Sequence, residues 1–99
     1  MDTQNTQETK YLSIINGPSA DLLVDAFRYS YSKEVRIRPS FVFYDLNDKK
    51  TIMMLERIVS IEYEDGSGDS YNVTAIVGDG IMKFYYNARL RKGCIPVTL

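Results

Sequence analysis

The spacing of apolar residues changes along the chain from a helical period to a period of two. A turn cluster, Asn16-Gly17-Pro18, is followed by Ser19, which can cap a helix, and by apolar residues at positions 22, 23, 26 and 27. This pattern predicts one helix over residues 19–30 with a single apolar stripe. Such a helix is too short to be stable alone, so it must pack on a sheet. A short β-prone segment, residues 11–15, precedes the turn cluster.

From Glu34 onward, apolar and polar residues alternate, which indicates β-structure. One face carries Val35, Ile37, Phe41 and Phe43, and the other carries Arg36, Arg38, Ser40 and Tyr44. Pro39 cannot donate to a ladder, so it marks an edge or a bulge. We expect residues 45–50 to close a hairpin in which apolar residues face each other, with the pairs Tyr44–Thr51, Phe43–Ile52 and Phe41–Met54.

The segment over residues 51–64 changes its apolar parity partway along. Ile52 and Met54 occupy even positions, whereas Val59, Ile61 and Tyr63 occupy odd positions. A straight strand would leave half of these side chains on the wrong face. The change therefore predicts a bulge or sharp bend within residues 55–58, so that one long strand serves two regions of a sheet.

Two further hairpins follow from turn signals. Residues 65–69 form a loop, and the strands on either side pair in the order Tyr63–Tyr71, Glu62–Asn72, Ile61–Val73, Ser60–Thr74 and Val59–Ala75. Asp79-Gly80 predicts a second turn, which places Met82, Phe84 and Tyr86 opposite Val77, Ala75 and Val73 and leaves Lys83 and Tyr85 facing outward. Residues 87–93 form a basic link. Residues 94–99 form a last short strand, which Pro96 assigns to a sheet edge.

These elements predict an α+β fold that is mostly antiparallel β: a small, strongly bent five-stranded sheet or barrel with one N-terminal helix packed on it. Residues 1–10 form a flexible polar tail, and residues 11–99 form one small domain. The order of elements from residue 19 to residue 99 resembles that of Sm-like and SH3-like small barrels, in which five bent antiparallel strands are capped by a helix. The resemblance concerns element order only. It carries no motif and assigns no functional residue.

Composition excludes several classes of function. The chain of 99 residues has no histidine and one cysteine, so the commonest general base, the histidine-dependent nucleophile pairs, most catalytic zinc sites and disulfides are missing. Twelve basic and thirteen acidic residues give a net charge of -1, which argues against nonspecific nucleic-acid binding by the whole chain. No apolar run reaches the roughly 20 residues that span a bilayer. We expect a cytoplasmic, non-catalytic protein without a cofactor, a metal site or membrane contact.

Tyrosines are the first candidates for a binding surface, because the chain holds eight of them. Tyr44 and Tyr85 lie on outward faces by parity, and Tyr29 and Tyr31 end the predicted helix. Large, stiff and amphipathic side chains of this kind anchor protein interfaces. The alternative is that they are ordinary surface residues with high strand propensity.

A local basic segment is the second candidate. Residues 83–92 contain four cations, no acid and Tyr85, a combination that can bind a phosphate backbone and stack bases. If the last strand lies beside the first, one positive region forms from Arg36, Arg38, Arg89, Arg91 and Lys92, with Lys83 on the adjoining strand. The alternative is that these are solvated side chains flanking a loop.

Three weaker signals complete the candidates. Glu62 and Glu64 share a strand face near Asp65 and Asp69, so they could hold a divalent cation, or they could be the wet face of a hairpin. The turn before the helix could cradle an anion or simply cap the helix. Cys94 is predicted to be a small buried apolar residue.

The sequence thus favours a small module that acts by occupying a protein surface, as an inhibitor or adaptor. A phage or mobile-element origin is the contextual expectation for such a stand-alone domain. The alternative is a small β-barrel that binds single-stranded nucleic acid or a nucleotide through the basic residues. A homo-oligomer formed through exposed edge strands is a third hypothesis.

Overall fold

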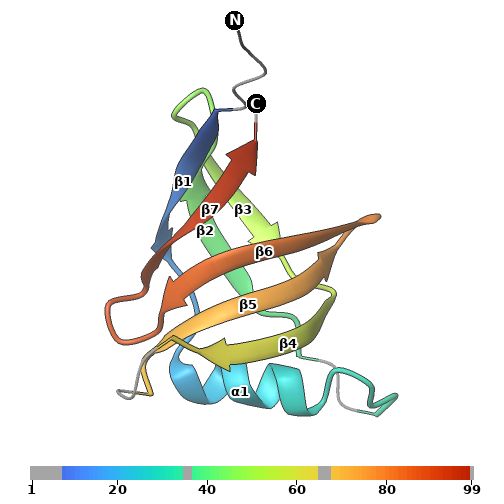
Figure 1. Ribbon diagram of the computed structural model, residues 1–99. Helices are drawn as coiled ribbons and strands as arrows, with labels where there is room; N and C mark the ends of the chain where they lie inside the picture. The colour runs from blue at the N-terminus through green and yellow to red at the C-terminus, as the bar shows by residue number, and fades with distance from the viewer. Residues whose placement is uncertain (1–7, 35–36, 65–67, 99) are drawn as a thin grey trace, which may run out of the picture.

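The computed structural model describes residues 8–34, 37–64 and 68–98, which form one helix and one antiparallel sheet of seven strands. The strands are β1 (Thr9–Asn16), β2 (Ser40–Tyr44), β3 (Lys50–Met54), β4 (Arg57–Tyr63), β5 (Ser70–Val77), β6 (Gly80–Asn87) and β7 (Lys92–Thr98). The helix α1 (Ala20–Arg28) lies along the β4 side of the sheet (Figure 1). The strand order is β3-β2-β1-β7-β6-β5-β4.

The sheet curls into a half-barrel because its two edge strands, β3 and β4, are consecutive in the chain. The backbone N–H of Leu55 donates to the Pro39 carbonyl at 3.0 Å, and the N–H of the next residue, Glu56, donates to the Ile76 carbonyl at 2.9 Å. Between residues 55 and 56, the backbone therefore changes its hydrogen-bonding partner from the segment that leads into β2 to strand β5. In Figure 1, β4, β5 and β6 cross the direction of β1 and β7. The predicted bend within residues 55–58 is confirmed.

The bent, mostly antiparallel sheet with one helix is confirmed, but the predicted number of five strands is wrong. The predicted long strand is divided at Leu55 into β3 and β4. The segment before the helix is a full strand, β1, which pairs with β7 from Thr9–Thr98 to Ile14–Gly93. The five-strand order of Sm-like and SH3-like barrels is therefore not reproduced. Strand β1 begins within the predicted tail, and residues 1–7 of that tail lie outside the described residues.

The core lies on the concave side of the sheet, where α1 packs. The Phe41 ring of β2 meets the rings of Phe84 and Tyr86 edge-on, at centroid distances of 5.0 and 4.9 Å. Helix α1 contributes the buried Leu23 and Ala26, and Ser19 caps it by accepting from the Leu22 N–H at 3.3 Å. The helix is shorter than predicted. These contacts place two crossing parts of the sheet around a single core.

The β4–β5 hairpin matches the sequence prediction closely. Four of the five predicted pairs are present: Tyr63–Tyr71, Glu62–Asn72, Ile61–Val73 and Ser60–Thr74. The fifth is wrong, since Ala75 faces Ile58 rather than Val59. The register shifts at Val59, which is left as a bulge residue and is 40% exposed.

The β2–β3 hairpin is present, but its predicted register is wrong by one residue. Phe41 faces Met53 instead of Met54, and Ile52 and Met54 are exposed. The loop closes one residue early because the Asp45 carboxylate accepts from the backbone N–H groups of Asn47 at 2.8 Å and Lys49 at 3.0 Å. The hydrogen bond from Lys49 is the main reason that the pKa of Asp45 is lowered.

The β5–β6 hairpin has the predicted faces but a register that differs by two residues. Phe84 faces Val73 and Tyr86 faces Tyr71, because Gly78, with φ 59°, and Asp79 form the turn in place of Asp79-Gly80. The assignment of the last strand to an edge is also wrong, since β7 lies between β1 and β6. Pro96 is nevertheless tolerated. It pairs with Tyr11 of β1, beyond the last residue of β7 that pairs with β6.

Candidate functional site

Strands β6 and β7 are joined at one end and separated at the other. They share three register pairs: Tyr85–Cys94, Tyr86–Gly93 and Asn87–Lys92. Beyond these pairs, β6 stays paired with β5 and β7 stays paired with β1, so the two strands diverge (Figure 1). In the part of the chain that the structure describes, residues 80–84 and 95–98 therefore pair on one side only. This leaves two open strand edges.

A hollow of about 420 Å³ lies where these strands diverge. We call it the β6–β7 groove and define it by five of its lining residues: Tyr11, Glu62, Lys83, Tyr85 and Pro96. They come from β1, β4, β6 and β7, and Tyr11 is 65% exposed. The core residues Val73 and Phe84 also reach the groove. The site thus has aromatic walls and carries one cationic and one anionic side chain.

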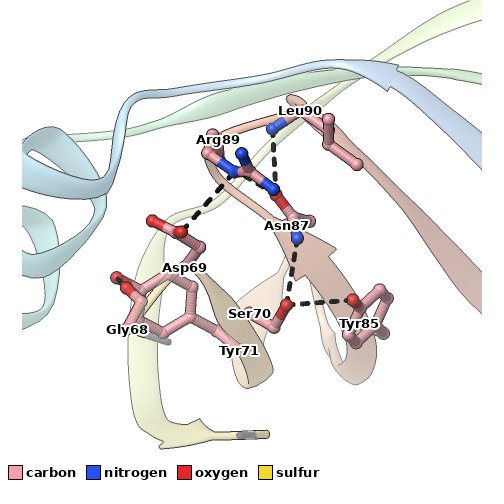
Figure 2. A network of polar contacts seen from close by, with 8 residues as sticks. All are labelled: Gly68, Asp69, Ser70, Tyr71, Tyr85, Asn87, Arg89 and Leu90. Atoms are coloured by element: carbon pink, nitrogen blue, oxygen red, sulfur yellow. Dashed lines mark hydrogen bonds and ion pairs between the residues drawn. The ribbon is translucent and has the colours of Figure 1, made fainter. Parts of the chain in front are cut away.

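Tyr85 is held in place by a polar network at the joined end of the strands (Figure 2). Its hydroxyl lies 3.1 Å from Ser70 Oγ, and Asn87 Nδ2 donates to the same Oγ at 3.0 Å. Asn87 Oδ1 in turn accepts from the backbone N–H groups of Arg89 at 3.0 Å and Leu90 at 2.9 Å. One asparagine therefore links the β6–β7 turn to the tyrosine that lines the groove, which preorganises this wall.

The loop before β5 is attached to the same turn. The Ala88 N–H donates to the Asp69 carbonyl at 2.8 Å. Figure 2 shows the Asp69 carboxylate beside Arg89, whose Nε lies 3.6 Å away. Nearby, the Tyr71 hydroxyl donates to the Gly68 carbonyl at 2.6 Å. Burial, followed by the proximity of Tyr63, Asp69 and Asp21, raises the pKa of Tyr71. These contacts fix the joined end of β6 and β7.

The structure separates the predicted basic residues. Lys83 lines the β6–β7 groove, Arg89 pairs with Asp69, and Lys92 is exposed at the start of β7. Arg38 and Arg91 line a different hollow beside the start of α1. Strand β7 lies beside β1, which the prediction did not count as a strand of the sheet, so the expected continuous region does not follow from the strand order. Arg36 lies outside the described residues.

The predicted partner-binding tyrosines also occupy separate places. Tyr85 lines the β6–β7 groove, whereas Tyr44 ends β2 on the opposite face to Phe43. Tyr29 is the C-cap of α1. Tyr31 lies two residues further along the chain, and the Arg57 guanidinium is 4.6 Å from the centroid of the Tyr31 ring. Sequence reasoning missed Tyr11, because its place in the groove depends on pairing with Pro96 at the far end of the chain.

The acidic residues of the β4–β5 hairpin and Cys94, which were weaker candidates, lie in different surroundings. Glu62 lines the groove, Glu64 accepts a hydrogen bond from Asn72 Nδ2, and Asp65 is outside the described residues. Within the described ranges, no group of three or more acidic or cysteine side chains could hold a metal ion. Cys94 was predicted to be buried, but it is half-buried and lines the groove. It lies at the point where β6 and β7 part.

Comparisons of the chain with protein-family models, with curated proteins and with solved structures gave no match. Among the described residues, α1 is the single helix, and its nine residues are too few to cross a membrane. Interpretation of the site therefore depends on its own geometry and chemistry.

Proposed function

We propose that this protein is a non-catalytic binding module that takes up an extended segment of another protein in the β6–β7 groove. The observation that carries the proposal is the divergence of β6 and β7, which leaves two open strand edges beside a groove with aromatic walls. An extended peptide adds main-chain hydrogen bonds to such an edge and places alternate side chains in the neighbouring hollow. Tyr11 and Tyr85 supply large, stiff contact surfaces for those side chains.

The charge of the groove favours a peptide over a nucleic acid. Lys83 and Glu62 both line it, so a polyphosphate backbone would meet a carboxylate as well as an ammonium group. Arg89, a predicted cation on the β6–β7 turn, is engaged with Asp69. A peptide with side chains of both signs matches this arrangement better.

The proposed binding role, as an inhibitor or adaptor, also agrees with the chemistry of the chain. The protein has no histidine, and its one cysteine, Cys94, lies unbonded in the groove wall. A free thiol is typical of reducing compartments, so we propose a cytoplasmic partner.

Peptide-display selection against the whole protein, followed by amide hydrogen exchange of the complexes, tests the proposal. Selected peptides should protect amides within residues 80–84 or 95–98, because these edges gain hydrogen bonds. Tyr11→Ala should weaken binding at least about tenfold, as expected for an aromatic anchor. Tyr31→Ala is the matched control, since Tyr31 is exposed to a similar extent (69%) but does not line the groove.

Three results would refute the peptide proposal: protection confined to other segments, equal losses in the two tyrosine variants, or no selected binder. The nucleic-acid alternative is tested with a single-stranded oligonucleotide at two salt concentrations. Binding that weakens steeply with salt and is lost in Lys83→Ala, without any peptide binding, would favour that alternative.

A further inference from the structure

A second hollow, of about 370 Å³, lies beside the loop that leads into α1 and the segment that leads into β2. Two arginines, Arg38 and Arg91, line it together with the apolar side chains of Leu22, Ile37 and Val42. Its lining includes no acidic residue, and neither arginine forms an ion pair with any other described residue. The hollow is therefore locally cationic in a chain whose net charge is -1.

One wall of this hollow is rigid. The buried Tyr86 hydroxyl donates to the Pro18 carbonyl at 2.7 Å, which fixes the loop before α1 to β6. Gly17 packs so closely that an added Cβ would lie 2.6 Å from the Tyr86 hydroxyl oxygen. Because the loop is held by buried contacts, this wall of the hollow is preformed, and a ligand does not have to order it.

Arg91 occupies an unfavourable backbone conformation at the edge of the hollow. Its φ of 56° lies in the left-handed region, which glycine adopts more easily than arginine. Its guanidinium donates one hydrogen bond, to the Gly17 carbonyl at 3.3 Å, out of the five N–H groups it carries. Arg91 thus combines a strained backbone conformation with guanidinium N–H groups that remain free to bind a ligand.

We propose that this hollow binds a small phosphate monoester. The guanidinium groups of Arg38 and Arg91 hold the phosphoryl oxygens, and Leu22, Ile37 and Val42 contact the apolar body of the ligand. Two guanidinium groups match the charge of a phosphate dianion, and their planar donor pairs match its oxygen atoms. The volume suits a small molecule. This site is separate from the β6–β7 groove and does not depend on its function.

Titration with phenyl phosphate, followed by NMR chemical shifts of the whole protein, tests the proposal. Phenyl phosphate should bind saturably, and benzoate should bind at least about tenfold more weakly, since it carries a single negative charge. Phenol should not bind, and inorganic phosphate should bind more weakly than phenyl phosphate because it lacks the apolar contact.

Variants identify the residues responsible. Arg91→Gly should weaken phenyl phosphate binding at least about tenfold and raise the Tm by about 4 °C, because the left-handed backbone is relieved. Arg38→Ala should weaken binding to a similar extent. Arg28→Ala is the matched control, since Arg28 pairs with Asp25 on α1 outside this hollow.

The proposal is overturned if phenyl phosphate shows no saturable binding, or if benzoate binds as tightly. It is also overturned if Arg91→Gly and Arg38→Ala leave binding unchanged, or if Arg28→Ala weakens it to the same extent as they do. A gain in stability together with a loss of binding in Arg91→Gly supports it, because a purely structural arginine would give no such combination.

Discussion

Strands β6 and β7 are hydrogen-bonded to each other at one end and separated at the other, and the two ends differ in what holds them. At the joined end, three register pairs, the turn held by Asn87 and the contact between Ser70 and Tyr85 hold the strands together. At the open end, β6 pairs only with β5 and β7 pairs only with β1, so among the described residues each strand has one unpaired edge. The groove therefore arises from divergence of paired strands rather than from a long loop. Its geometry depends on contacts at the opposite end of the same strands.

The joined end should depend most strongly on Gly93, whose backbone pairs with both Ile14 and Tyr86. A Cβ at this position would lie 2.1 Å from the Tyr85 carbonyl oxygen, which is main chain and cannot rotate away. Gly93→Ala should therefore lower the free energy of unfolding by about 3 kcal/mol or more, or prevent folding. Urea denaturation measures this effect.

Gly80→Ala is the control for this prediction. Gly80 begins β6 at the open end, and the nearest atom to an added Cβ is 4.0 Å away. The substitution should change the free energy of unfolding by less than about 1 kcal/mol. If the two variants lose similar stability, the close approach of β6 and β7 is not the feature that holds the joined end.

Tyr86 lies at the same end and should make stability depend on alkaline pH. Burial raises its pKa to about 12, and the nearby Arg91 opposes part of this rise. Since the folded-state pKa exceeds the ordinary value of 10.0, stability is fully present below pH 10 and is lost as pH rises toward 12. The loss should be on the order of 2 kcal/mol.

Denaturation between pH 8 and pH 12 tests this linkage. Tyr86→Phe should be less stable at neutral pH by about 1 kcal/mol, because the hydrogen bond to Pro18 is absent, but its pH profile should be flatter. Tyr71, whose pKa is also raised, is retained in both proteins and contributes equally to both profiles. An equally steep profile in Tyr86→Phe would contradict the assignment of the pH dependence to Tyr86.

The hairpins differ in how far the sequence predicts their register. The β4–β5 register was predictable for four pairs because apolar and polar residues match on both faces of the hairpin. The β2–β3 register was not, since the Asp45 carboxylate closes the loop through local hydrogen bonds that apolar parity does not report. Residues 52–55 are all apolar, so either of two registers places an apolar residue opposite Phe41, and only the turn decides between them.

The candidate site was less predictable than the fold. Lys83 and Tyr85 were identified as outward neighbours on one strand, and both line the groove. Tyr11 was missed because its position depends on a strand pair between the two ends of the chain, for which no local pattern exists. The pairing of Arg89 with Asp69 was missed for the same physical reason. Contacts between distant segments follow from the curl of the sheet rather than from residue spacing.

Asn87 offers a smaller perturbation of the joined end. Asn87→Ala removes the acceptor for two backbone N–H groups and the donor to Ser70, so it should cost about 1.5 kcal/mol. Asn87→Asp keeps the acceptor oxygen and loses the donor, so it should cost roughly half as much. Urea denaturation measures both variants. Equal losses would place the stabilisation in the contact with Ser70 rather than in the turn.

The ion pair between Arg89 and Asp69 should contribute least to the joined end. Both side chains are partly exposed, and the charged atoms are 3.6 Å apart. Arg89→Ala should therefore lower the free energy of unfolding by about 0.3 kcal/mol, with less effect at high salt. A double-mutant cycle with Asp69→Asn measures the coupling, and a value above about 1 kcal/mol would show that charge rather than backbone geometry sets this end. We expect the smaller value, because the Ala88 N–H still donates to the Asp69 carbonyl in every variant of the cycle.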